Sequence, residues 1–307
     1  MIIYKPGFRE VQFLDSSLGA VITAMVTPFD ATGKVDYPAA VKLARHLSKN
    51  GSRAVVLSGT TGESPTLTKE EKLELFRRVV EEVGHDIKVI AGTGSNSTAA
   101  TIELTAEAAG TGVDAFLVVT PYYNRPTQEG LYEHFKSVAA ATDLPVILYN
   151  VPGRTGVNMT AATTLRLAEI ENIVAVKEAS GNVEQAAAIC RRAPEGFALY
   201  SGDDAMTLPL LSVGAEGVIS VASHLVGQEI AQMITYYKEG HPREAGRIHA
   251  RLLPLFKGLF VVTNPIPLKA ALNLTGIRVG EPRLPLLPLD RELIPGLKQL
   301  LAEINAG

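Results

Sequence analysis

The sequence has a single cysteine, Cys190, so it cannot form an intramolecular disulfide, and this thiol is expected to pack as a small apolar side chain. It has no excess of basic residues, because 29 Lys and Arg stand against 32 Asp and Glu. The net charge of −3 offers no basic field for nucleic acid or for an anionic membrane. The sequence also lacks any apolar run near the ~18 residues of a bilayer span, and residues 1–17 lack the apolar core of a signal peptide. These absences predict a cytoplasmic protein that binds neither nucleic acid nor membranes.

Aliphatic residues, by contrast, are abundant. Hydrophobic residues make up 46% of the chain and charged residues 20%, which is typical of a globular protein with a large buried core. The 307 residues are enough for one large core, or for one core with a small appended unit.

Short aliphatic runs alternate with longer segments of helical period from Ala20 onward. Near-continuous runs of Val, Ile, Leu and Ala are typical of parallel strands that are covered on both faces. Between the runs, segments such as 68–83 place apolar residues on one helical face, and Thr68 with Glu71 predicts a capping box where that helix begins. The eight runs span residues 20–29, 53–59, 88–94, 115–121, 145–152, 173–180, 197–203 and 217–223.

Eight strands, each followed by a helix, predict an α/β fold of the (β/α)8 or TIM-barrel type. A doubly wound open sheet shows the same alternation, but the count of eight and a length of about 220 residues favour the barrel. From about Gly240 the pattern is helical only. We therefore predict an N-terminal arm at 1–17, a catalytic barrel at 18–240 and a C-terminal α-helical domain at 241–307.

A barrel places its chemistry at the C-terminal ends of its strands. Lys177 lies at the end of the sixth run, whereas Lys88 lies at the start of the third run and so on the opposite rim. The other strand-end residues that are not aliphatic are Thr60, Thr61, Tyr122, Tyr123, Tyr149, Asn150, Arg154, Gly202 and Asp203. These side chains are expected to converge on one mouth of the barrel.

Lys177 is the candidate nucleophile. Burial disfavours an ammonium, lowers its pKa and leaves more of the amine neutral, which is how a Schiff-base lysine is made. The alternative is a lysine that extends from the strand end into water. A neutral amine that attacks a ketone gives an iminium, and this electron sink makes the neighbouring carbon acidic.

Proton movement in such a reaction needs an acid/base beside the amine. The phenol of Tyr149 fits this role, and hydroxyls from Thr60 to Tyr123 form a possible route for protons to solvent. Taken singly, each tyrosine is better explained as a core aromatic with a satisfied hydroxyl. Arg154, in a Pro-Gly loop, offers a rigid fork for a carboxylate, or is a solvated loop arginine.

The glycine-rich segments, the paired aspartates and the histidines do not indicate a nucleotide, dinucleotide or metal site. The segment GTTGES at 59–64 has no following Lys-Ser/Thr and is not a P-loop, and GTGSNS at 92–97 lacks the third glycine of a dinucleotide fingerprint. Asp203 and Asp204 are interpreted as caps of the next helix. The six histidines are expected mostly on polar helix faces or turns, and none has metal-site spacing. No cofactor or metal is predicted.

Seven ordered motifs resemble the dihydrodipicolinate synthase family, which also contains the N-acetylneuraminate lyases. They are GTTGE at 59–63, VTPYYNRP at 119–126, YNVPGRTG at 149–156, VKEASGN at 176–182, LYSGDD at 199–204, GVISV at 217–221 and NPIPLKAAL at 264–272. The resemblance covers roughly Leu18 to Leu289. It implies a Schiff-base lyase of lysine (diaminopimelate) biosynthesis, built as a (β/α)8 barrel with a C-terminal helical domain and assembled as a homotetramer, a dimer of dimers.

The resemblance also implies site residues, carried across by motif. Lys177 would form the Schiff base with pyruvate, Tyr149 would be the acid/base, and Thr60 and Tyr123 would complete the relay, with Tyr123 crossing from a partner subunit. Three further residues would contact substrate. Thr61 would bind the pyruvate carboxylate, while Gly202 and Ile219 would line the pocket.

The aldehyde substrate is the point on which the family divides. Arg154 matches the arginine that the synthases use for the carboxylate of L-aspartate 4-semialdehyde, and GTTGE rather than GSTGE favours the same assignment. The alternatives are a related pyruvate-dependent aldolase, such as an N-acetylneuraminate lyase or a sugar-acid aldolase, and a barrel that senses a keto acid without turnover. A sensor is expected to lose the lysine or the tyrosine relay, and this chain keeps both.

Residues of the family's lysine-binding allosteric cleft are only partly kept. Ser64, Asn96 and Tyr122 match, but Lys69, Lys72 and Ala100 stand where inhibited members have histidines and a glutamate. Two cations and a missing carboxylate are unsuited to an amino group. We therefore expect weak or absent inhibition by lysine.

Overall fold

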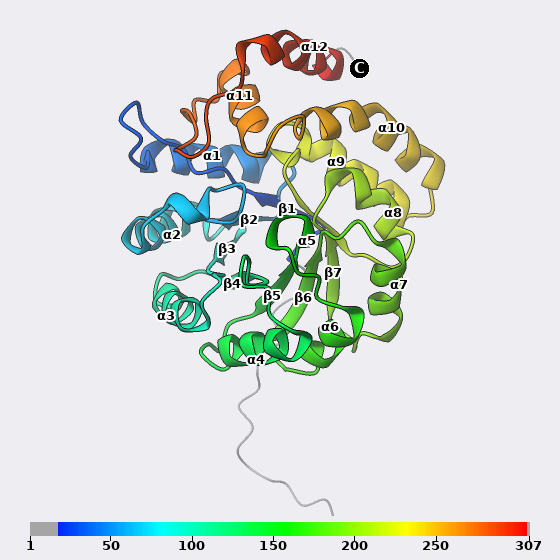
Figure 1. Cartoon of the computed structure of the whole chain (residues 1–307). Helices are drawn as coiled ribbons and strands as arrows, with labels where there is room; N and C mark the ends of the chain where they lie inside the picture. Colours follow the sequence, from blue (N-terminus) through cyan, green and yellow to red (C-terminus); the bar gives the residue numbers. More distant parts are fainter. Residues whose placement is uncertain (1–17, 306–307) are drawn as a thin grey trace, which may run out of the picture.

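Eight parallel strands form a closed barrel in the computed structural model, which describes residues 18–305 (Figure 1). The strands pair in sequence order and β1 pairs with β8, so the sheet has no free edge and the predicted barrel is confirmed over the open sheet. The predicted arm, residues 1–17, lies outside the described range. The strands are β1 Val21–Ala24, β2 Ala54–Leu57, β3 Lys88–Gly92, β4 Ala115–Val119, β5 Val146–Asn150, β6 Ile173–Glu178, β7 Ala198–Ser201 and β8 Gly217–Ser220.

A helix follows every strand and covers the outside of the barrel (Figure 1). The predicted capping box is present, because Thr68 accepts from the Glu71 amide and Glu71 accepts from the Thr68 amide, at the start of α2. The helices that follow the strands are α1 Tyr37–Lys49, α2 Lys69–Val83, α3 Thr98–Ala109, α4 Gln128–Ala139, α6 Ala161–Ala168, α7 Val183–Arg192, α8 Thr207–Leu211 and α9 Ser223–Lys238. A four-residue helix, α5 Pro152–Thr155, lies in the loop after β5 and carries Arg154.

Two apolar layers result from the alternation of side chains along each strand. The larger lies between the barrel and its helices, and the smaller fills the barrel interior. Tyr149, Tyr200 and Ile219 belong to the interior layer. Residues near the C-terminal ends of β5 to β8 therefore face a packed interior from which water is largely excluded.

The chain after α9 is helical, as predicted, with α10 Pro242–Gly258, α11 Ile266–Leu274 and α12 Ile294–Asn305. The boundary predicted near residue 240 falls in the turn between α9 and α10, and these two helices pack on each other. Helix α12 packs on α10 and α11 beside the barrel (Figure 1). Within residues 18–305, no helix combines the length and the apolar character that a membrane crossing requires.

Two histidines depart from the expectation of polar helix faces. His134 is buried, with Nδ1 2.9 Å from the Thr98 hydroxyl, and His224 is buried between the Val221 carbonyl and the Val26 amide. Burial lowers the pKa of both imidazoles to about 4, so both are neutral at pH 7. They serve as packed hydrogen-bonding groups.

A buried ion pair joins the loop after β2 to the C-terminal helices. Glu63 lies in that loop and Lys269 in α11, and their Oε1 and Nζ atoms are 2.7 Å apart. The Lys269 ammonium also lies 4.0 Å from the Phe29 ring centroid, and Glu63 Oε2 accepts from the Arg283 amide at 2.8 Å. The C-terminal segment thus fixes the loop that carries Thr60 and Thr61.

Replacing Lys269→Met should destabilise the protein by about 3–5 kcal/mol, because the Glu63 carboxylate would remain buried without its cation. Urea unfolding measures this loss. Arg166→Met is the control, because the Arg166–Glu129 pair is exposed and such pairs contribute little. Equal shifts in the two variants would contradict the importance of the buried pair.

Candidate active site

Lys177 is the penultimate residue of β6 and is only 4% exposed. Its register partners are Tyr149 on β5 and Tyr200 on β7, and its Nζ lies 4.4 Å from the centroid of the Tyr149 ring. Gly202 leaves room for it, since a Cβ at that position would come within 3.2 Å of Lys177 Cε and 2.6 Å of Ala179 Cβ. A glycine is therefore required beside the lysine.

The pKa of Lys177 is lowered to about 8, chiefly by burial, while the Asp204 carboxylate raises it and the Arg154 cation adds to the lowering within that net value. Burial dominates because an ammonium loses more hydration free energy than the surrounding charges return. A lysine with this pKa is about a tenth neutral at pH 7, against about one in three thousand for an ordinary lysine. The amine is thus prepared for nucleophilic attack.

Tyr149 is the phenol nearest to that amine. Burial raises its pKa, whereas the Arg154 cation and a hydrogen bond with Thr60 lower it. The phenol is protonated at pH 7 and is able to donate a proton to an oxygen that develops beside Lys177. The structure thus brings together Lys177, Tyr149 and Thr60, as the sequence predicted.

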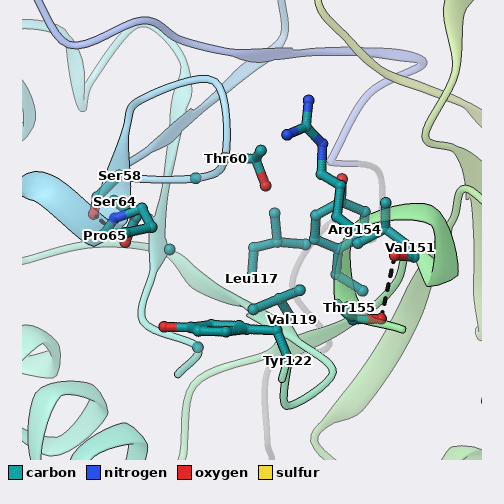
Figure 2. Close-up of a pocket in the computed structure, with 14 residues that line it drawn as sticks. Ser58, Thr60, Ser64, Pro65, Leu117, Val119, Tyr122, Val151, Arg154 and Thr155 are labelled. Carbon is teal, nitrogen blue, oxygen red and sulfur yellow. Dashed lines mark hydrogen bonds between the residues drawn. The ribbon is translucent and has the colours of Figure 1, made fainter. Parts of the chain in front are cut away.

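A cavity of about 240 Å³ adjoins Thr60 and Tyr149 (Figure 2). Thr60, Tyr149 and Arg154 line it, and Figure 2 shows Thr60 and Arg154 on one side and Tyr122 across from them. Arg154 also donates from Nη2 to the Asn264 carbonyl at 3.4 Å. A small carboxylate in this cavity would meet the Arg154 cation and the Tyr149 ring, and the Lys177 Nζ lies 4.4 Å from the centroid of that ring.

Thr61, Gly202 and Ile219 lie around the same end of the barrel. Thr61 is buried and accepts a hydrogen bond from the Asn264 side chain at 2.9 Å. Ile219 is fully buried in the interior layer that includes Tyr149. Sequence patterns gave no role to Asn264, although it begins the NPIPLKAAL motif, because its contact with Thr61 spans 203 residues.

Tyr123 does not line the cavity of its own chain. Its side chain is 88% exposed and its φ is +75°, a left-handed conformation that is costly for a bulky residue. Tyr122 beside it does line the cavity. The strained turn therefore places Tyr122 in the cavity wall and exposes the next tyrosine, Tyr123.

Asn150 and Asp204 have other roles than expected, whereas Asp203 has the predicted one. Asn150 points away from the mouth and donates to the buried Glu178 carboxylate, because alternate residues of a strand face opposite sides. Asp203 caps the following turn as predicted, accepting from the Ala205 amide. The capping assignment for Asp204 is wrong, because its buried carboxylate accepts from Ser220 Oγ and from the two amides that follow β8.

A second cavity of about 250 Å³ shares Ser64, Pro65, Gly94 and Tyr122 with the first. Its other lining residues include Lys69, Lys72, Ala100 and Glu103, so most of the predicted allosteric positions do meet, whereas Asn96 does not line it.

The two lysines that line the second cavity differ in whether a carboxylate neutralises them. Lys69 Nζ lies 2.6 Å from a Glu103 oxygen and 2.8 Å from a Glu107 oxygen, so its charge is neutralised. Lys72 makes no ion pair with any residue in the described part of the chain, and burial lowers the pKa of its ammonium. Tyr122 lies between the two cavities.

These features define a class of protein. A desolvated lysine beside a protonated phenol, at the C-terminal end of a closed (β/α)8 barrel, is the arrangement of a Schiff-base lyase or aldolase. No group of three or more His, Cys, Asp or Glu side chains within residues 18–305 is arranged to hold a metal ion.

The chain belongs to the Dihydrodipicolinate synthetase family, whose model matches residues 17–304. It is 56% identical over 285 residues to the 4-hydroxy-tetrahydrodipicolinate synthase of Desulforudis audaxviator, covering 93% of this chain and 97% of that protein. The dihydrodipicolinate synthase of Cyanidioschyzon merolae, solved with lysine bound, has a TM-score of 0.93 and 55% identity over 94% of this chain and 98% of that one. A monomeric dihydrodipicolinate synthase variant has a TM-score of 0.91 and 43% identity, over 94% and 97% of the two chains.

Lysine added to the purified protein should inhibit it weakly or not at all, because an ammonium entering the second cavity would meet the Lys72 ammonium and no free carboxylate. Initial rates against lysine concentration measure this. The double variant Lys72→Ala with Ala100→Glu, which removes the cation and adds a carboxylate, should gain sensitivity. Inhibition of the unaltered protein by submillimolar lysine would contradict the prediction.

Proposed function

We propose that this chain condenses pyruvate with L-aspartate 4-semialdehyde to give 4-hydroxy-tetrahydrodipicolinate, the reaction after which its relatives are named. The observation that carries the proposal is the buried Lys177, whose Nζ lies 4.4 Å from the centroid of the Tyr149 ring, next to a cavity that Tyr149 and Arg154 line. In this reading both substrates are small carboxylates, which matches the size and the charge of the cavity.

The first half of the reaction forms the Schiff base. The neutral Lys177 amine adds to the pyruvate ketone, Tyr149 delivers a proton to the carbinol oxygen, and water leaves to give an iminium. Thr61 holds the pyruvate carboxylate, while Gly202 and Ile219 border the methyl and ketone carbons. Loss of a methyl proton then yields an enamine.

The second half forms the carbon–carbon bond. The enamine carbon attacks the aldehyde carbon of the semialdehyde, whose carboxylate is bound by Arg154, and the semialdehyde's own amine then displaces Lys177 and closes the ring. Tyr149, Thr60 and Tyr123 pass the protons.

The exposed position of Tyr123 supports its insertion into the site of a neighbouring subunit, so the proposed relay is completed in a homotetramer built as a dimer of dimers. The monomeric variant among the similar structures makes the assembly state a property to be measured for this chain. Sedimentation together with the activity of a Tyr123→Phe variant tests whether assembly and turnover are linked.

The semialdehyde should be preferred over glyceraldehyde and N-acetylmannosamine when initial rates are measured with pyruvate held fixed, because only the semialdehyde places a carboxylate near Arg154. Borohydride trapping of the pyruvate adduct is the control for the first half-reaction, and Lys177→Ala should abolish it. Trapping of pyruvate without turnover of the semialdehyde would indicate that this chain is a different pyruvate-dependent aldolase, with another aldehyde as its substrate.

In the same assay, Arg154→Ala should lower kcat/KM for the semialdehyde by about 30-fold or more, since losing one partner of a hydrogen-bonded charge pair costs about 2–5 kcal/mol. Pyruvate trapping should change far less. Arg191→Ala is the matched control, because it removes an exposed arginine from the C-terminal end of α7, away from the cavity. Unchanged semialdehyde kinetics in Arg154→Ala would remove the main support for the aldehyde assignment.

A further inference from the structure

Asn264 directly precedes Pro265, the N-cap of α11, and its side chain joins the C-terminal segment to the loop that carries Thr61. We propose that Asn264 is a positioning residue that orients the Thr61 hydroxyl as a hydrogen-bond donor toward the pyruvate carboxylate. This inference rests on the proposed function, in which Thr61 binds that carboxylate.

The geometry that carries the proposal is one buried hydrogen bond. Asn264 is 4% exposed and Thr61 is 2% exposed, and the Asn264 Nδ2 donates to Thr61 Oγ1 at 2.9 Å. No other side-chain hydrogen bond to Thr61 Oγ1 occurs within residues 18–305. The Thr61 proton is therefore committed to no protein acceptor in that part of the chain.

A hydroxyl has one proton and two lone pairs. When its oxygen accepts from an amide N–H, the proton has to point in another direction, so Asn264 leaves Thr61 as a donor. A carboxylate accepts hydrogen bonds and cannot donate one. In this arrangement Asn264 donates to Thr61, and the Thr61 hydroxyl is left to donate to a bound carboxylate. The donor is therefore oriented before the substrate binds.

Asn264 is itself held in place from several directions. Its carbonyl accepts from Arg154 Nη2 at 3.4 Å, and the loop carrying Thr61 is fixed to the same segment by the Glu63–Lys269 ion pair at 2.7 Å. One residue of the C-terminal segment therefore contacts both Thr61 and Arg154, the two side chains proposed to bind the carboxylates of the two substrates.

The remaining acceptor of the amide argues against a purely structural role. Asn264 Oδ1 is buried and has no hydrogen-bond partner in the described part of the chain. A buried acceptor without a partner costs stability. Within the described residues, only the donor of this side-chain amide is satisfied, and its partner is the Thr61 hydroxyl.

Two variants of Asn264 separate orientation from packing. Asn264→Asp keeps the shape but replaces the donor by an acceptor, so the Thr61 proton would turn to the new carboxylate and away from pyruvate. Asn264→Ala removes the donor and leaves Thr61 free to rotate. KM for pyruvate should rise by about ten- to hundredfold in Asn264→Asp and by less in Asn264→Ala. KM for the semialdehyde should change little, because the carbonyl that meets Arg154 remains.

Both variants are then measured in a Thr61→Val background, which removes the hydroxyl. If Asn264 acts through Thr61, each substitution should now change KM for pyruvate by no more than about twofold. Asn273→Ala is the structural control. Asn273 lies in α11 and bonds the backbone at Gly280 and Val279, so its loss should lower the unfolding midpoint and leave KM for pyruvate unchanged.

Three outcomes would overturn the inference. They are a larger effect of Asn264→Ala than of Asn264→Asp, equal effects with and without the Thr61 hydroxyl, and a rise in KM for pyruvate in Asn273→Ala. Failure of the proposed function is distinguishable, because the unaltered protein would then show no trapped pyruvate adduct and no turnover.

Discussion

The proposed chemistry depends first on the burial of the Lys177 side chain away from water. A closed parallel barrel has no edge at which this side chain could reach solvent sideways, and the aromatic residues of β5 and β7 flank it on both sides. Gly202 supplies the space, and the nearby Arg154 and Asp204 charges adjust the pKa in opposite directions. The desolvated amine is thereby more often neutral at pH 7 than an ordinary lysine, and so more nucleophilic.

The C-terminal segment acts on the same site from outside the barrel. Glu63 and Lys269 form a buried ion pair, and Asn264 bonds both Thr61 and Arg154. A pair of buried charges has to be well fixed to compensate for its lost hydration, so the loop after β2 is held in one conformation. The C-terminal helical segment therefore contacts the candidate site as well as the rest of the fold.

The fold was predictable because its strands and its helices each have a hydrophobic pattern that repeats along the chain. Eight aliphatic runs with helices between them gave the barrel, and the position of Lys177 at a strand end singled it out as the candidate nucleophile. Contacts between distant segments were not predictable from any local pattern, and these include the Asn264–Thr61 hydrogen bond. Asp204 was taken for a cap because the sequence does not show that its carboxylate faces the amides after β8. The conformation of Tyr123 was missed for a similar reason, since its left-handed turn carries no glycine signal.

The most direct test of the account is the rate of covalent trapping of pyruvate, at limiting pyruvate with cyanoborohydride, measured from pH 6 to pH 10 and mapped to Lys177 by peptide mass spectrometry. Below its pKa the amine is protonated and does not attack, so the rate should rise with pH and reach half its plateau near pH 8, because burial lowers the pKa of Lys177 to about 8. A rate that still rises steeply at pH 10, as for an exposed lysine, or a label on another lysine, would contradict the central claim.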